Sequence, residues 1–201
     1  MRIIKKNQLD EAMEFLKKGK ILVFPTETSY GLGCDATNQS AVDKIFKIKG
    51  RKSDKPLLVV VPNIEMAKKY LVWNELLDKL ANKYWPGPLT IVGEAQSDCG
   101  LAKGVFSSEG TLALRVTNHP TPKFISESLG KPLVATSANI ADTGDLYSAE
   151  EVAKIFENKE NQPDIILDYG ELPHAKPTTI ASVINNELKI LRQGELEINN
   201  I

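Results

Sequence analysis

Cysteine and histidine are scarce in this 201-residue chain, which has two of each. Cys34 and Cys99 are too few for a disulfide framework and favour a reducing compartment. No ligands stand at the spacing typical of zinc sites, so we expect no protein-built metal centre. His119 and His174 each lie beside a proline, and no G-x-S-x-G elbow surrounds Ser137, which argues against a serine hydrolase.

Long apolar runs and a net charge are also lacking. The longest aliphatic run is 57–61, far below the ~20 apolar residues that a membrane span needs. Residues 1–8 do not have the apolar stretch of a signal peptide. Lys plus Arg total 25 and Asp plus Glu total 26, which excludes a wholly basic nucleic-acid coat and an acidic disordered tail. We expect a soluble cytoplasmic protein without a membrane partner.

Apolar periodicity predicts alternating helices and strands, with Asn7 and Ser40 as the caps of the first two helices and Gly50 as the end of the second. The run 57–61 lacks alternation, as in strands buried on both faces. We therefore expect an α/β fold, with a twisted mixed parallel/antiparallel sheet flanked by helices, in a single domain over residues 1–201. The expected helices are 9–16, 40–49, 63–71, 73–84, 122–129 and 148–156; the expected strands are 21–24, 57–61, 89–92, 111–116, 132–136, 165–167, 180–184 and 188–191; the expected loops include 25–33 and 94–110.

The densest charge is a run of six cations within residues 44–55. A solvated helix face followed by a charged loop explains this composition. Three of the cations, however, flank the end of a helix and precede a buried strand, where α/β sheets often place a ligand crevice. Cations grouped on a nearly neutral protein suit a triphosphate or an RNA backbone. The six are Lys44, Lys47, Lys49, Arg51, Lys52 and Lys55.

The loop 25–33 is rich in hydroxyl groups, from Thr26, Thr28, Ser29 and Tyr30. Glycines beside them let the backbone approach a ligand closely. The spacing matches neither a Walker A motif nor a dinucleotide fingerprint. An ordinary connection between elements explains this loop equally well.

Small polar side chains follow the strand expected at 132–136. Ser137 and Asn139 there can donate hydrogen bonds to a phosphate or a ribose. Ser148, with Glu151 three residues on, is foremost a helix cap. A helix N-terminus also attracts anions, so both roles can coexist at Ser148.

Arg115 is expected in the middle of a strand, on the same face as Thr111. An arginine in such a position usually needs a carboxylate or phosphate partner. Arg192 closes the last expected strand, and alone it is typical of a surface arginine.

Five short motifs occur in order between residue 21 and about residue 193, and together they resemble the YrdC/Sua5 family in its short, single-domain form. Members of that family are threonylcarbamoyl-AMP synthases. The motifs are Pro25-Thr26-Glu27-Thr28-x-Tyr30-Gly31-Leu32, Lys49-Gly50-Arg51, Trp85-Pro86-Gly87-Pro88-Leu89-Thr90, Arg115-Val116 and Ser137-Ala138-Asn139.

The resemblance implies a reaction in which L-threonine, bicarbonate (or CO2) and ATP give threonylcarbamoyl-AMP and pyrophosphate. A downstream threonylcarbamoyl-transferase complex then uses the product for t6A at position 37 of tRNA. Thr28 and Arg115 would bind threonine, and a Mg²⁺ ion would bridge the phosphates without a carboxylate cage. The implied catalytic residues are Lys49, Arg51, Ser137 and Asn139, and the implied ATP contacts are Arg51, Lys55, Thr111, Ser137, Asn139, Ser148 and Arg192.

Three alternatives stay open. In the first alternative, the chain is an RNA-binding module whose basic strip meets duplex or tRNA backbone, since the fold of the family is also associated with double-stranded RNA. In the second, it is a paralogue that acts on another carbamoyl acceptor. In the third, it handles carbamoyl phosphate, which predicts AMP formation from carbamoyl phosphate and ATP.

Overall fold

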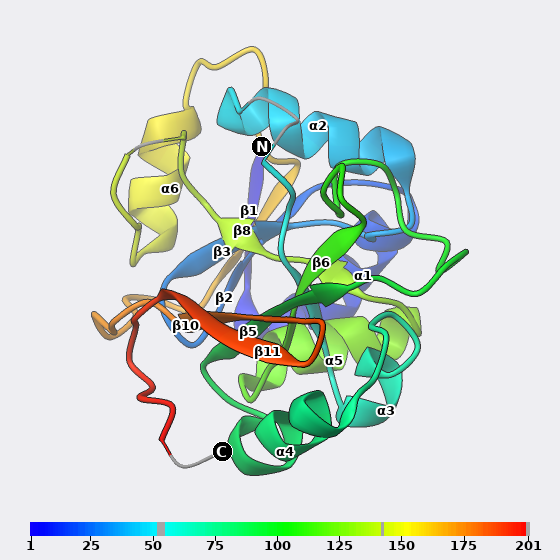
Figure 1. The fold of residues 1–201 in the computed structure, drawn as a ribbon. Helices are drawn as coiled ribbons and strands as arrows, with labels where there is room; N and C mark the ends of the chain where they lie inside the picture. Colours follow the sequence, from blue (N-terminus) through cyan, green and yellow to red (C-terminus); the bar gives the residue numbers. More distant parts are fainter. Residues whose placement is uncertain (52–54, 142, 200–201) are drawn as a thin grey trace.

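The strands of the chain divide into two mixed sheets (Figure 1) in the computed structural model, which describes residues 1–51, 55–141 and 143–199. Parallel and antiparallel pairs occur in both, which confirms the α/β class with mixed pairing; the single expected sheet is two sheets. The five-stranded sheet has the order β1 (Arg2–Lys5), β9 (Ile165–Asp168), β2 (Leu22–Pro25), β3 (Tyr30–Gly33), β8 (Thr136–Ser137). The six-stranded sheet has the order β11 (Glu187–Arg192), β10 (Thr179–Ile184), β5 (Leu89–Glu94), β6 (Thr111–Val116), β4 (Val59–Val61), β7 (Leu133–Val134).

Helices cover both sheets. Helices α1 and α5 pack on β2, and they also reach β9 and β4 respectively, so this pair spans the junction of the sheets. In Figure 1, α2 lies at the top and α4 at the bottom, with the strands between them. The helices are α1 (Leu9–Lys17), α2 (Gln39–Lys49), α3 (Ile64–Ala67), α4 (Glu75–Tyr84), α5 (Pro120–Leu129) and α6 (Ala149–Phe156), with the 3-10 turn η1 (Lys6–Gln8) before α1.

Central strands send alternate side chains into two separate cores. In β4, Val60 packs with the α1–α5 side, whereas Val59 and Val61 pack into the larger core on the other side. Leu22 and Val23 of β2 divide in the same way. Each strand is therefore buried on both faces, which confirms the interpretation of the unbroken apolar run 57–61.

Of the three predicted helix caps, those at Asn7 and Ser40 are wrong, whereas Ser148 is confirmed as the cap of α6. Helix α2 begins one residue earlier than expected, and Asn38, not Ser40, caps it: the Asn38 Oδ1 atom accepts a hydrogen bond from the backbone N–H of Ala41 at 3.1 Å. Asn7 lies inside η1, so its side chain does not stand at the start of α1. Gly50 ends α2 as predicted, with a left-handed φ of 59° that suits glycine.

Three segments differ from the expectation because strand pairing, which the residues of one segment alone do not show, decides them. Charged β1 is a strand through its parallel pairing with β9. The expected loop 25–33 contains β3, which pairs with β2 and β8. The expected strand 132–136 is β7 and β8, which belong to different sheets. That crossing between the sheets carries the chain to Ser137.

The expected long loop 94–110 is irregular apart from the end of β5 and two isolated bridges, which confirms the expectation. Among the described residues, no helix is both long and apolar enough to cross a membrane.

Candidate functional site

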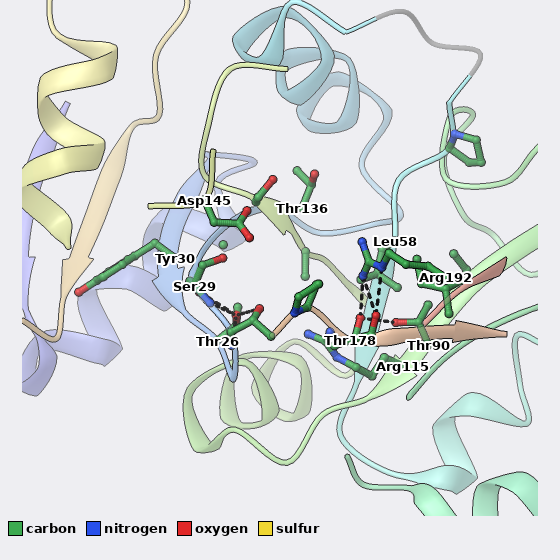
Figure 2. Close-up of a pocket in the computed structure, with 18 of the residues that line it drawn as sticks. Thr26, Ser29, Tyr30, Leu58, Thr90, Arg115, Thr136, Asp145, Thr178 and Arg192 are labelled. Carbon is green, nitrogen blue, oxygen red and sulfur yellow. Dashed lines mark hydrogen bonds between the residues drawn. The ribbon is translucent and has the colours of Figure 1, made fainter. Parts of the chain in front are cut away.

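Three arginines from distant stretches of the chain line one cavity of about 370 Å³. Arg51 follows α2, Arg115 lies in β6, and Arg192 ends β11. We call this space the arginine cavity; Figure 2 shows Arg115 and Arg192 close to Thr178 on one side of it. The expected threonine-binding residue Thr28 also lines it. The fold thus brings the predicted amino-acid and phosphate residues into one place.

Arg115 is buried and has a carboxylate partner within the chain. Its Nη2 atom lies 3.2 Å from Oε2 of Glu27, and only 4% of the Arg115 surface is exposed. The expectation of a carboxylate or phosphate partner for this arginine is thereby met. Its Nε atom is itself buried and has no hydrogen-bond partner among the described residues, while Arg115 as a whole lines the arginine cavity.

Glu27 is a positioned carboxylate. Its Oε1 atom accepts hydrogen bonds from the Thr117 hydroxyl and from the backbone N–H groups of Asn118, at 3.1 Å, and His119, at 3.4 Å. Burial raises the pKa of Glu27, but Arg115 and Thr117 lower it more, so the net pKa is below its ordinary value. Glu27 therefore stays ionised and fixes the guanidinium of Arg115.

Arg192 is held against the edge of β10. Its Nε and Nη2 atoms donate to the carbonyl oxygen of Thr178 at 3.1 and 2.8 Å. The Thr178 hydroxyl lies 3.3 Å from that of Thr90, and both threonines line the arginine cavity (Figure 2). Sequence reasoning missed Thr90 and Thr178 as lining residues, although Thr90 ends one of the five motifs.

The turn between β2 and β3 forms another wall of the arginine cavity. The Thr26 hydroxyl donates to the carbonyl oxygen of Ser29 at 2.7 Å and accepts from the N–H of Thr28 at 3.3 Å. These bonds order the loop, so Thr28 is presented to the cavity by Thr26. Tyr30 points away in Figure 2, because its hydroxyl donates to the carbonyl oxygen of Gly170 at 2.8 Å.

A second cavity, of about 730 Å³, adjoins the first. We call it the lysine cavity. Four residues line both cavities: Arg51, Thr136, Ser137 and Asp145. Lys49, Lys55 and Asn139 line the lysine cavity alone. Among the described residues that line the two cavities, Asp145 is the one acid.

The run of cations divides between different surroundings. Lys44 is paired with Asp164 at 2.7 Å, away from both cavities, and Lys47 is exposed on α2. Lys52 lies outside the described residues. A solvated helix face thus explains Lys44 and Lys47 in the first part of the run. Lys49, Arg51 and Lys55 line the cavities.

Lys49 is buried at the end of α2, and it contacts two of the other predicted catalytic residues. Its Nζ atom donates to the carbonyl oxygen of Ser137 at 2.6 Å and to the side-chain oxygen of Asn139 at 2.8 Å. Burial, and then the nearby Arg51, lower the pKa of Lys49 to about 8, although Asp145 opposes the shift.

Two predicted ATP contacts do not line either cavity. The hydroxyl of Thr111 lies 2.8 Å from that of Ser107, at the start of β6. Ser148 caps α6 by accepting from the N–H of Glu151 at 3.2 Å, and Glu151 completes the capping box. The geometry supports the structural role of Ser148 and gives no support to nucleotide contact by either residue.

The arginine cavity is lined by cationic side chains from three separate segments of the chain. Arg51, Arg115 and Arg192 face a common space, hydroxyl groups line it, and a carboxylate fixes one guanidinium. Within the described ranges, no three His, Cys, Asp or Glu residues are grouped so that they could hold a metal. The arrangement suits a polyanion beside a small carboxylate.

Comparison with protein families identifies relatives of this chain. The model of the Sua5/YciO/YrdC family, described as "Telomere recombination", matches residues 14–194. The chain belongs to this family. Its relatives in the family include the threonylcarbamoyl-AMP synthase of Pseudoalteromonas translucida, 34% identical over 180 residues, which are 88% of this chain and 94% of the relative. That of Aliivibrio fischeri is 32% identical over 191 residues, 92% of this chain and 98% of the relative.

Solved structures of the family have the same fold. Pyrococcus abyssi Sua5 complexed with L-threonine superposes with a TM-score of 0.87 at 31% identity over 98% of this chain. The chain spans 58% of the length of that Sua5 chain. Escherichia coli YciO superposes with a TM-score of 0.82 over 98% of this chain and 96% of its own, but at 22% identity it shows the fold alone.

Proposed function

We propose that this chain is a threonylcarbamoyl-AMP synthase. It joins L-threonine, bicarbonate (or CO2) and ATP into threonylcarbamoyl-AMP and releases pyrophosphate. The convergence of Arg51, Arg115 and Arg192 on one hydroxyl-lined cavity is the observation that carries the proposal. The names of the relatives, and the L-threonine bound to a Sua5 structure 31% identical to this chain, support it.

Arg115 and Thr28 bind the amino acid in this proposal. The carboxylate of threonine meets the guanidinium of Arg115, which lines the arginine cavity. Glu27 holds that guanidinium in a fixed orientation, so the amino acid meets an ordered donor. Thr28 lines the same cavity and offers a hydroxyl group.

The phosphates lie toward the junction of the two cavities, between Arg51 and Arg192 and beside Lys55. The carboxylate oxygen of threonylcarbamate bonds to the α-phosphorus of ATP, and the bond from that phosphorus to the pyrophosphate oxygen breaks. The leaving pyrophosphate carries away the electron pair. A carboxylated amine is a poor and unstable nucleophile, so alignment and neutralisation of charge by fixed cations supply the catalysis.

Mg²⁺ fits the residues at this junction as an ion carried by the nucleotide. Asp145 lines both cavities, and it is the one acidic side chain among the described residues that line them. Mg²⁺ at nucleotide sites is often held by one or two carboxylates together with the substrate phosphates. When bound, the ion supplies further neutralisation of phosphate charge.

The remaining expectations stay proposals of the same kind. Residues 1–201 act as one YrdC-like domain in the cytoplasm. A downstream threonylcarbamoyl-transferase complex takes up the labile product for position 37 of tRNA, and direct contact with tRNA belongs to the same proposal.

Incubation with ATP, bicarbonate and each amino acid in turn, followed by mass spectrometry for an acyl-adenylate, tests this function. We expect threonylcarbamoyl-AMP with L-threonine. An acyl-adenylate formed with another amino acid but not with L-threonine would identify the chain as a paralogue. AMP formed from carbamoyl phosphate and ATP would show instead that the chain handles carbamoyl phosphate. RNA binding indifferent to ATP and threonine, with no adenylate at all, would favour the RNA-binding module.

A further inference from the structure

Every N–H group of the Lys49 ammonium has an acceptor within the chain. The Nζ atom lies 2.6 Å from the carbonyl oxygen of Ser137, 3.0 Å from that of Asn139 and 2.8 Å from the side-chain oxygen of Asn139. A lysine ammonium has three donors, and all three are engaged here. The side chain is almost completely buried, with 3% of the residue exposed.

Asn139 passes this restraint on to the next stretch of chain. Its side-chain oxygen accepts from Lys49 and from the hydroxyl of Ser137, the latter at 2.7 Å. Its amide nitrogen donates to the carbonyl oxygens of Thr143 at 2.5 Å and of Gly144 at 3.0 Å. The oxygen and the nitrogen of one amide thus tie the ammonium of Lys49 to residues 143–144.

Residues 143–146 form a wall of both cavities. Asp145 lines the arginine cavity and the lysine cavity, and Thr143 lines the latter. Next along the chain, the carbonyl oxygen of Leu146 accepts from the N–H of Tyr30 at 2.9 Å, which links this wall to β3. The backbone of Lys49 adds a further tie, because its carbonyl oxygen accepts from the N–H of Ala141 at 3.0 Å.

We propose that Lys49 is a positioning residue that acts through Asn139 on the wall 143–146, and not a ligand of the phosphates. This inference rests on the proposed function for its catalytic consequence. A phosphate oxygen would have to replace a hydrogen bond that Lys49 makes to a buried oxygen, which would leave that oxygen unsatisfied. Arg51, the other cation of the motif Lys49-Gly50-Arg51, meets the nucleotide together with Lys55.

Amide hydrogen exchange without any nucleotide tests the positioning role directly. We expect Lys49→Met to speed exchange across residues 140–147 by at least about tenfold, since it removes the hydrogen bonds that a charged donor makes to Ser137 and Asn139. Lys47→Met, a substitution at an exposed lysine on the same helix, should leave exchange there unchanged. Exchange in Lys49→Met equal to that of the unmodified chain would overturn the proposal.

A double-mutant cycle on ATP affinity, measured by isothermal titration, tests the route through Asn139. If Lys49 acts through Asn139, the double variant Lys49→Met/Asn139→Ala binds ATP no more weakly than the weaker single variant. If the loss of ATP affinity in the double variant equals the product of the losses in the two single variants, Lys49 contacts the phosphates directly and the proposal is contradicted. The pair Arg51→Met with Asn139→Ala is the comparison, and its losses should multiply.

The two measurements separate the two proposals. If the unmodified chain does not bind ATP, the proposed function fails and hydrogen exchange still decides the role of Lys49. Should Lys49→Met not fold, Asn139→Ala replaces it in the exchange experiment, because it removes the same link to residues 143–144. Unchanged exchange across 140–147 in Asn139→Ala would then overturn the positioning role.

Discussion

The arginine cavity and the lysine cavity hold their buried cations in different ways. Arg115 faces a carboxylate, Glu27, at 3.2 Å, whereas Lys49 is bound by uncharged oxygens of Ser137 and Asn139. The charge of Arg115 is balanced within the fold, so its contribution is an oriented pair of donors. No carboxylate among the described residues forms an ion pair with Lys49, whose pKa burial and then the nearby Arg51 lower to about 8.

This difference separates recognition from architecture. In the arginine cavity, the guanidinium is paired with Glu27 and lines the cavity, so in the proposed function the cation itself meets an anion. In the lysine cavity, the buried cation has no donor left and shapes the wall instead. Cations of the same motif set thus differ in role because their hydrogen-bond partners differ.

The largest effect is expected from Arg115→Leu, which leaves Glu27 buried without its cation. Breaking a buried ion pair on one side costs about 3–5 kcal/mol of folding free energy. Urea unfolding measures this loss, and the double variant Arg115→Leu/Glu27→Gln should recover part of it.

In activity assays, Arg115→Leu should raise the KM for threonine more than the KM for ATP. The opposite order would show that the amino acid and the nucleotide divide the cavity differently.

Arg51→Ala should come next, with a loss of pyrophosphate release of about 100-fold or more at unchanged fold, because a cation aimed at the transferred phosphate is removed. A radiolabelled pyrophosphate assay in the presence of threonine and bicarbonate measures it, and circular dichroism checks the fold. Lys47→Ala is the matched control, since Lys47 is exposed and lies outside both cavities. Turnover in Arg51→Ala equal to that of the control would remove this residue from the phosphate site.

The pH dependence of stability should distinguish the two cavities at the acid end. The pKa of Glu27 in the fold lies below its ordinary value of 4.5, so its ion pair stabilises the fold above pH 4.5. That contribution is lost as the pH falls below 4.5 and through the lower pKa of the folded state. Glu27→Gln should flatten this part of the curve, whereas Lys49→Met should not. An identical acid limb in Glu27→Gln would mean that other carboxylates govern it.

The smallest effects are expected at the two predicted ATP contacts that lie outside the cavities. Ser148→Ala should cost about 1 kcal/mol of stability through loss of the helix cap. Both Ser148→Ala and Thr111→Val should bind ATP within about twofold of the unmodified chain, because a surface change away from the ligand costs at most about 0.5 kcal/mol. Calorimetry measures both quantities, and a tenfold loss of ATP affinity in either variant would return that residue to the nucleotide site.

Local patterns were sufficient for much of the fold. Helical periodicity located α1, α4 and α6 to within two residues at either end, and the apolar run 57–61 predicted a strand buried on both faces. The division into two sheets could not be predicted, because it depends on pairing between strands far apart in sequence. Strands β1 and β3 were missed because their own residues have no clear alternation of apolar and polar side chains.

The site was predictable where side-chain chemistry stands out and not where it depends on a distant partner. Arg51 was found in a dense run of cations and Arg115 by its place in the middle of a strand, whereas Arg192 entered the predicted site only through the family resemblance. Glu27 stands 88 residues before Arg115, and no local pattern says that the two side chains meet. Lys49 was named as a catalytic residue through the family resemblance, since the sequence shows its charge and its motif but not the acceptors that surround it.

A crystal structure with L-threonine and a non-hydrolysable ATP analogue tests the central claim most directly. We predict the carboxylate of threonine on the guanidinium of Arg115, and the triphosphate between Arg51 and Arg192 with the bonds of Lys49 unchanged. Ligands bound outside the two cavities, or a triphosphate that reaches neither Arg51 nor Arg192, would contradict the account.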